Sequence, residues 1–117
     1  MERYILAHDL GTSGNKATLF SEGGRLIRSE VFAYDTHYFN DTWVEQNADD
    51  WWKAVCETSR SLIHKTCVSP SDIAAISFSG QMMGCLCVDQ EGRPGGESAA
   101  SFYHMGGPEG TAAGCTA

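Results

Sequence analysis

Asp9-Leu10-Gly11-Thr12-Ser13-Gly14 stands between two predicted strands near the start of the chain. The apolar run before it, residues 4–7, predicts a buried strand, and residues 16–20 after it predict a second strand. Two strands joined by a short turn with glycine at both ends predict a β-hairpin. The turn carries one carboxylate, two hydroxyls and two glycines, so any function of the hairpin is expected there.

This turn has two interpretations. In the first it binds phosphate, because the N–H groups of such a turn form an anion-binding concavity and glycine allows close approach and positive φ. The hydroxyls of Thr12 and Ser13 then donate to phosphate oxygens, and Asp9 is a candidate ligand for Mg²⁺, which favours one or two carboxylates plus substrate phosphates. In the second it is a plain tight turn with Asp and Ser as turn formers.

The rest of the chain predicts an α/β fold, a mixed sheet with a helix packed on it. Residues 26–32 predict a third strand antiparallel to the second, and residues 34–40 a loop. Asn47 is a good N-cap for a helix from about residue 48 to residue 66. Its expected buried stripe comprises Trp52, Val55, Cys56, Ser59, Leu62 and Ile63.

Two further strands are expected after the helix. Residues 73–79, Ile-Ala-Ala-Ile-Ser-Phe-Ser, are expected to form a strand that is buried on both faces and therefore central. Residues 85–89 predict another strand. From residue 95 onward Gly, Ala, Ser and Thr dominate and apolar periodicity stops, so residues 95–117 are expected to be disordered.

The composition of the chain limits the classes of partner and the cellular location that are expected. The chain has 117 residues and a formal net charge of −7, with no basic cluster, which argues against nucleic acid and anionic membranes as partners. No apolar run approaches membrane-spanning length, and the N-terminal apolar segment is too short for a signal peptide, so a cytoplasmic location is expected. The five cysteines are odd in number and lack zinc spacing; buried free thiols are the favoured interpretation over a disulfide or metal site.

Three motifs stand in order along the chain: the turn above, Trp43-Val44-Glu45-Gln46, and Phe78-Ser79-Gly80-Gln81-Met82-Met83-Gly84. Together they resemble the N-terminal end of FGGY-family carbohydrate kinases, closest to the xylulokinase-like branch, over roughly residues 3 to 94. The turn is not a Walker A loop, because no Gly-Lys-Ser/Thr ends it and no helix follows.

The resemblance implies an incomplete domain of the ribonuclease-H-like fold, in the actin-like ATPase superfamily. It implies ATP and Mg²⁺ as cofactors and a sugar or polyol as substrate. By this resemblance Asp9 lies near Mg²⁺, while the phosphoryl group and the sugar are contacted by two sets of residues. These are Gly11, Thr12 and Ser13 for phosphate, and Gln81, Met82 and Met83 for the sugar.

Two departures from the family pattern limit what this chain is expected to do. Met83 stands where xylulokinases usually have His, so the sugar is left open; core packing is the alternative role for Met82 and Met83. The family's catalytic Asp base and adenosine pocket belong to a later part of a much longer chain, so no catalytic residue is expected here and the fragment alone is expected to be inactive. A non-catalytic binding module on the same fold is the competing hypothesis, and a homodimer is a candidate assembly.

The tail suggests an origin of its own. Family members continue with a Trp-x-Asp-x-Arg segment, which residues 95–117 lack. Back-translated and read one nucleotide later, with permitted codons, residues 104–110 give Ile-Trp-Ala-Asp-Gln-Arg-Ala. The tail is therefore also interpreted as the product of a frameshift.

Overall fold

A computed structural model describes residues 1–39, 43–82, 84–94 and 100–102, and it divides the chain into two compact units. The first unit contains residues 1–34 and 51–81, and the second contains residues 35–50 and 82–117. Each unit has its own four-stranded sheet.

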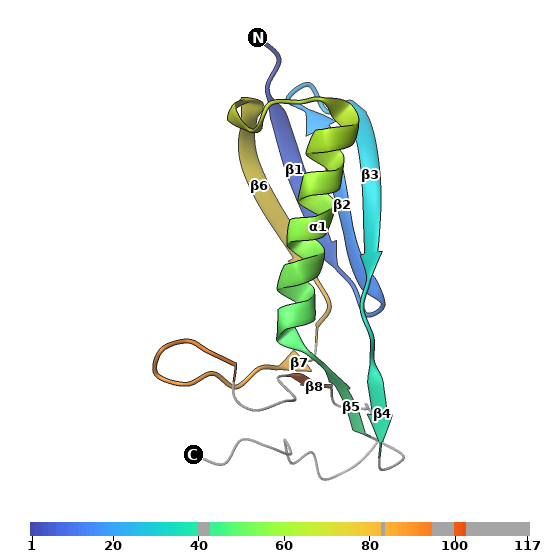
Figure 1. Ribbon diagram of the computed structural model, residues 1–117, viewed down its shortest axis with the longest axis vertical. Coiled ribbons are helices and arrows are strands. Elements are labelled where there is room, and N and C mark those ends of the chain that lie inside the picture. The colour runs from blue at the N-terminus through green and yellow to red at the C-terminus, as the bar shows by residue number, and fades with distance from the viewer. Residues whose placement is uncertain (40–42, 83, 95–99, 103–117) are drawn as a thin grey trace. The chain divides into compact units, whose positions relative to one another are not determined.

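The sheet of the first unit has the strand order β3-β2-β1-β6 (Figure 1). Its strands are β1 (Tyr4–Leu10), β2 (Gly14–Ser21), β3 (Leu26–Ala33) and β6 (Ile73–Gly80). The first three form an antiparallel meander, which confirms the predicted hairpin and third strand, whereas β6 pairs with β1 in parallel. The sheet is therefore mixed, as the sequence predicted.

Helix α1 (Ala48–Thr66) has the bounds that the sequence predicts. Its N-cap is also confirmed, because the side-chain Oδ1 of Asn47 accepts a hydrogen bond from the N–H of Asp49 at 3.0 Å. A short 3₁₀ helix, η1 (Pro70–Asp72), leads from the end of α1 into β6. No described helix has the length and apolar character needed to cross a bilayer.

The core of the first unit lies between α1 and the middle of its sheet. Leu62 packs there against Leu6, Ala17 and Leu19 from β1 and β2. The buried positions of α1 are Ala54, Val55, Thr58 and Leu62. The predicted stripe was therefore right about Val55 and Leu62 but wrong about Trp52, which is 67% exposed. The buried positions Ala54, Thr58 and Leu62 follow one another at intervals of four residues. The prediction placed the buried stripe off Ala54 and Thr58 because it counted the large Trp52 ring as buried.

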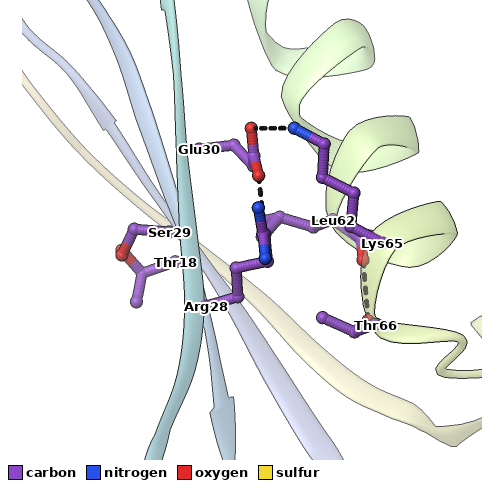
Figure 2. A network of polar contacts seen from close by, with 7 residues as sticks. All are labelled: Thr18, Arg28, Ser29, Glu30, Leu62, Lys65 and Thr66. Carbon is purple, nitrogen blue, oxygen red and sulfur yellow. Dashed lines mark hydrogen bonds and ion pairs between the residues drawn. The ribbon is translucent and has the colours of Figure 1, made fainter.

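A charged cluster joins β3 to the last turn of α1 (Figure 2). The Glu30 carboxylate accepts from Arg28 Nε at 2.7 Å and from Lys65 Nζ at 2.9 Å. On the opposite side of β3, the hydroxyls of Thr18 and Ser29 are 2.9 Å apart. The β3 edge is thus held to the helix by charge.

The prediction that residues 73–79 form a central strand is wrong. Within the described part of the chain β6 pairs only with β1, and it is the edge strand of its sheet. Ile76 and Phe78 are 57% and 55% exposed. The core residues on the sheet come from β1 and β2. An apolar sequence is therefore not sufficient evidence that a strand is central and buried on both faces.

The described residues of the second unit form four short strands. They are β4 (His37–Phe39), β5 (Trp43–Gln46), β7 (Gly84–Cys85) and β8 (Ala100–Phe102), in the order β4-β5-β8-β7. The predicted loop at residues 34–40 therefore contains a strand, because β4 finds an antiparallel partner in β5. The strand predicted at 85–89 is shorter than expected: β7 ends at Cys85, and Asp89 begins a turn in which its Oδ1 accepts from the N–H groups of Glu91 and Arg93.

Two expectations concern the tail and the cysteines. Of residues 95–117 only 100–102 are described, as β8, so the expectations of disorder and of a frameshift fall largely outside the described residues. Cys56, Cys67 and Cys85 are free thiols, but Cys56 and Cys85 are only half-buried and Cys67 is exposed, so the expectation of burial is not met by these three. Cys87 is disulfide-bonded, so the free-thiol expectation is wrong for that residue.

Candidate phosphate-binding site

The hairpin turn is closed by its own backbone. Asp9 and Leu10 are the last residues of β1, and Leu10 pairs with Asn15 across the turn. Inside it the N–H of Gly11 donates to the carbonyl of Gly14 at 3.0 Å. This N–H is therefore used by the turn, which leaves Thr12 and Ser13 at its exposed tip.

Gly14 is required for packing rather than for an unusual backbone conformation. Neither Gly11 nor Gly14 has a positive φ, so the expectation that the turn uses that freedom is wrong. A Cβ at Gly14 would lie 2.7 Å from the backbone oxygen of Phe32 and 3.0 Å from the Cα of Ala33. The close approach of β2 to β3 therefore excludes any side chain at this position.

The end of β6 lies directly beside the turn. Ser79 Oγ donates to Asp9 Oδ1 at 3.1 Å, and the N–H of Gln81 donates to the carbonyl of Leu10 at 2.7 Å. The parallel pairing of β1 and β6 thus brings the first and third motifs to the carboxyl ends of neighbouring strands, where ligands of α/β sheets commonly bind.

Tyr34 is a site residue that sequence reasoning missed. Its Oη donates to the carbonyl of Gly11, and its N–H donates to the carbonyl of Ser13 at 3.2 Å. The side chain is 8% exposed, and burial, followed by the negative charge of Asp9, raises the pKa of Tyr34. The pairing of Gly14 with Ala33 carries the chain past the turn, so the length of β3 was the signal that could have found this contact.

The charges at the turn suit a magnesium–phosphate complex. Asp9 is exposed and pairs in register with Lys16 on β2, so these two side chains leave the same face of the sheet. Among the described residues no group of three or more His, Cys, Asp or Glu could hold a metal. Asp9 would therefore supply a single carboxylate, which fits Mg²⁺ because that ion takes its remaining ligands from water and phosphate.

The three residues predicted to contact the sugar are not all described by the structure, and the two that are described belong to different units. Gln81 is half-buried at the end of β6 in the first unit. Met82 belongs to the second unit and is 80% exposed, which rules against core packing for its side chain. Met83 lies outside the described residues.

Solved structures define the class of this fold. The chain resembles a xyloylose kinase from Brucella ovis with a TM-score of 0.77 and 31% identity, over 83% of this chain and 20% of that one. A gluconate kinase from Lactobacillus acidophilus matches with a TM-score of 0.75 and 25% identity, over 85% of this chain and 20% of that one. These neighbours have the actin-like ATPase fold, and the first unit, with its mixed sheet and helix, is part of such a domain.

Sequence comparison then gives the family. Residues 4–99 match the FGGY family of carbohydrate kinases, N-terminal domain, and the chain belongs to this family. A glycerol kinase from Nostoc sp. is 38% identical over 92 residues, and a xylulose kinase from Staphylococcus xylosus is 31% identical over 91 residues. Each match covers 78% of this chain and 18% of the relative, so the chain spans about a fifth of these relatives' length.

The family fixes the type of chemistry but not the substrate. FGGY carbohydrate kinases are phosphotransferases that use ATP, typically with Mg²⁺. The matched relatives include glycerol kinases as well as xylulose kinases, so the xylulokinase-like branch is one of several to which this chain is similar.

Proposed function

We propose that this chain forms the first phosphate-binding wall of an ATP-dependent kinase for a sugar or polyol. The observation that carries the proposal is the hydrogen bond between Ser79 and Asp9 at 3.1 Å, which joins the turn of the β1–β2 hairpin to the end of β6. Family membership supports the same reaction class. In phosphoryl transfer the protein acts mainly by positioning groups and stabilising charge, and an exposed turn with a fixed carboxylate suits that task.

Each residue of the turn has a distinct proposed role. Asp9 binds Mg²⁺, directly or through water, with Ser79 fixing one of its oxygens. Thr12 and Ser13 donate to the transferring phosphoryl group, and Gly11 lets the backbone approach it, although its own N–H is used within the turn. Tyr34 holds the turn in place by donating hydrogen bonds to the carbonyls of Gly11 and Ser13.

The proposed substrate is a small polyhydroxy compound. The matched relatives are named for glycerol, xylulose and gluconate, all of which carry several hydroxyl groups. Gln81, Met82 and Met83 are the proposed contacts to this substrate, and a xylulose-like pentulose is the finer proposal. Exposure of Met82 supports a contact role over a packing role.

The chain alone is proposed to transfer no phosphate, because the resemblance assigns the catalytic base and the adenosine pocket to a later part of a longer chain, and phosphoryl transfer needs these groups positioned together. Incubation with ATP, Mg²⁺ and a panel of pentuloses, gluconate and glycerol should give no product above background. Turnover near ordinary kinase rates would contradict this part of the proposal.

Phosphate binding is tested separately by NMR titration of the chain with tripolyphosphate and Mg²⁺. We expect shifts of the Thr12 and Ser13 amides, a several-fold weaker affinity in Thr12→Val, and loss of the Mg²⁺ effect in Asp9→Asn. Thr66→Val, on α1, is the matched control and should bind as the wild type does. Unchanged binding in both turn variants would contradict the proposed phosphate site and favour the interpretation of the segment as a plain tight turn.

The competing hypothesis is a non-catalytic binding module on the same fold. Such a module should be monodisperse and should expose little apolar surface. Ile76 and Phe78 are more than half exposed on β6, which favours part of a larger kinase over a finished module.

A further inference from the structure

Strand β6 is an exposed edge of the sheet in the first unit (Figure 1). All of its residues are exposed except Ile73 at its start, which is half-buried. Its sequence, Ile-Ala-Ala-Ile-Ser-Phe-Ser-Gly, contains no charged residue and no proline. Natural edge strands commonly carry charge, proline or a covering element that prevents pairing with another chain, and among the described residues β6 has none of these.

The backbone of β6 can accept a further strand on its outer side. Its pairing with β1 is regular over residues 75–80, and the next N–H, that of Gln81, donates inward to β1 at 2.7 Å. Since successive residues of a strand direct their N–H and C=O groups to opposite sides, those of Ile76, Phe78 and Gly80 point away from β1. No described strand pairs with this side of β6.

Two side chains of β6 continue the hydrophobic core toward this edge. Ile76 pairs in register with the core residue Leu6, and Phe78, two residues on, points to the same face. The Phe78 ring stacks on His8 with centroids 5.2 Å apart, and His8 Nδ1 is 2.9 Å from Asn15 Nδ2. The sheet therefore holds both apolar side chains from the inside, yet more than half of each is exposed.

The charge of the chain favours a second copy as the partner for this edge. The net charge is −7, so two copies repel each other over most of their surfaces. Strand β6 is neutral, and an identical strand can approach it without placing like charges opposite one another. A basic partner would find no acidic residue on β6. The other edge strand, β3, carries Arg28 and Glu30 and lacks this match.

We propose that β6 is a self-association site, at which a second copy of this chain pairs its own β6 in antiparallel orientation. Ser77 lies opposite Ser77 of the partner subunit in a non-hydrogen-bonded pair, so Ile76 lies opposite Phe78 of the partner subunit. This register joins the outward backbone groups of both strands. It also places two β-branched–aromatic pairs on the core face, and such cross-strand pairs are stabilising.

The contact has consequences for assembly and for the candidate site. It is a twofold, isologous contact that uses the β6 edge of both copies, so association stops at the dimer. Because the strands run antiparallel, the two candidate phosphate-binding turns lie at opposite ends of the joined sheet. The inference does not rest on the proposed function, since the pairing needs neither phosphate nor metal.

Sedimentation equilibrium of the 117-residue chain, in reducing buffer without phosphate or Mg²⁺, tests the association. We expect a reversible monomer–dimer equilibrium with no larger species. Ile76→Lys brings like charges together at the twofold contact and removes two apolar contacts, so it should raise Kd by about tenfold or more. Val31→Lys, at a position that is 68% exposed on β3, is the matched control and should leave Kd close to the wild-type value.

Disulfide trapping tests the register. In a non-hydrogen-bonded antiparallel pair the two Cα atoms are about 4.5 Å apart, which is within the range of a disulfide. Ser77→Cys should therefore form a covalent dimer under mild oxidation, above the background given by the wild-type thiols. Ala75→Cys, also exposed and on the same face, is the control, because its two copies would be about 13 Å apart and should not cross-link.

Several results would overturn the proposal. A chain that stays monomeric at its highest soluble concentration would do so, as would an Ile76→Lys variant that dimerises like the wild type. Growth beyond the dimer, or trapping at Ala75 as readily as at Ser77, would show a different contact. Trapping does not require Ile76→Lys to fold, so the test holds even if that variant does not. Because phosphate and Mg²⁺ are absent, none of these results bears on whether the chain serves a kinase.

Discussion

The two edge strands of the first unit's sheet, β3 and β6, differ in the side chains that they expose. On the β3 edge, Arg28, Glu30 and Lys65 form a charged cluster that ties the strand to α1 (Figure 2). On the β6 edge no residue is charged, and Ile76 and Phe78 are more than half exposed. Natural sheets usually protect an edge with charge or cover, and among the described residues only the β3 edge follows this rule.

The difference shows that the described residues protect one edge of the sheet with charge and leave apolar side chains exposed on the other. Parallel strands are normally buried on both faces, and β6 is the strand that pairs in parallel. The strongly apolar sequence of β6 is suited to an environment that the described residues do not supply. The core under α1, by contrast, is filled.

The largest effect should come from the filled side of this comparison. Leu62 is fully buried, so Leu62→Ala should lower the free energy of unfolding by about 2–5 kcal/mol. Ile76→Ala should cost about 1 kcal/mol or less, since over half of that side chain is already exposed. Urea denaturation measures both, and equal losses would show that β6 is as well packed as the core.

An intermediate effect is expected on association, where a homodimer is one candidate state. An uncovered apolar edge should make the wild-type chain associate at high concentration and bind an apolar dye. Ile76→Lys should reduce both, as followed by light scattering on a sizing column and by dye fluorescence.

Val31→Lys on β3 is the matched control, because Val31 is 68% exposed on the other edge. It should change association less than Ile76→Lys does. A wild-type chain that remains monomeric and binds no dye at high concentration would contradict the contrast between the edges.

The smallest effect should come from the charged cluster. Hydrogen bonds from Lys65 and then Arg28 lower the pKa of Glu30 from 4.5 to about 2. Between these values the unfolded chain binds more protons than the folded one, so the stabilisation is present above about pH 4.5 and is lost as the pH falls toward about 2. Glu30→Gln should lose this part of the pH dependence, as measured by urea midpoints at about pH 6 and about pH 3.

The matched control for this change is Glu57→Gln, which removes an exposed pair with Arg60 on the surface of α1. It should alter the acid limb less than Glu30→Gln does. Salt should weaken the Glu30 effect, because the cluster lies near solvent. An acid limb that is identical in Glu30→Gln and the wild type would show that the cluster does not stabilise the β3 edge.

Local pattern was sufficient for the hairpin, β3 and α1 of the first unit. Apolar segments and turn residues predicted the hairpin and β3, and Asn47 together with apolar spacing predicted α1 to its ends. The same reasoning failed for β6, because an apolar strand shows what a segment can bury and not whether a covering element is present. It also missed β4, whose pairing with β5 is not visible in either segment alone.

The candidate site was only partly readable from sequence. Asp9 and Ser13 stood out because their residue types and spacing carry chemistry, and the resemblance added Gln81. Tyr34 and the pair formed by His8 and Asn15 were missed because their contacts depend on strand register. His8 and Asn15 meet only when Leu10 pairs with Asn15 and His8 with Ala17, which no single segment of sequence states.

The parallel pairing of β1 with β6 also sets an order of folding. The β1–β2–β3 meander needs only short loops to close, whereas Ser79 must reach Asp9 across 70 positions of chain. Loop-closure entropy therefore favours early formation of the hairpin and late docking of β6. During synthesis the turn would form before β6 is available to pair with β1. The hydrogen bond from Ser79 to Asp9 would form only after α1 and β6 have left the ribosome.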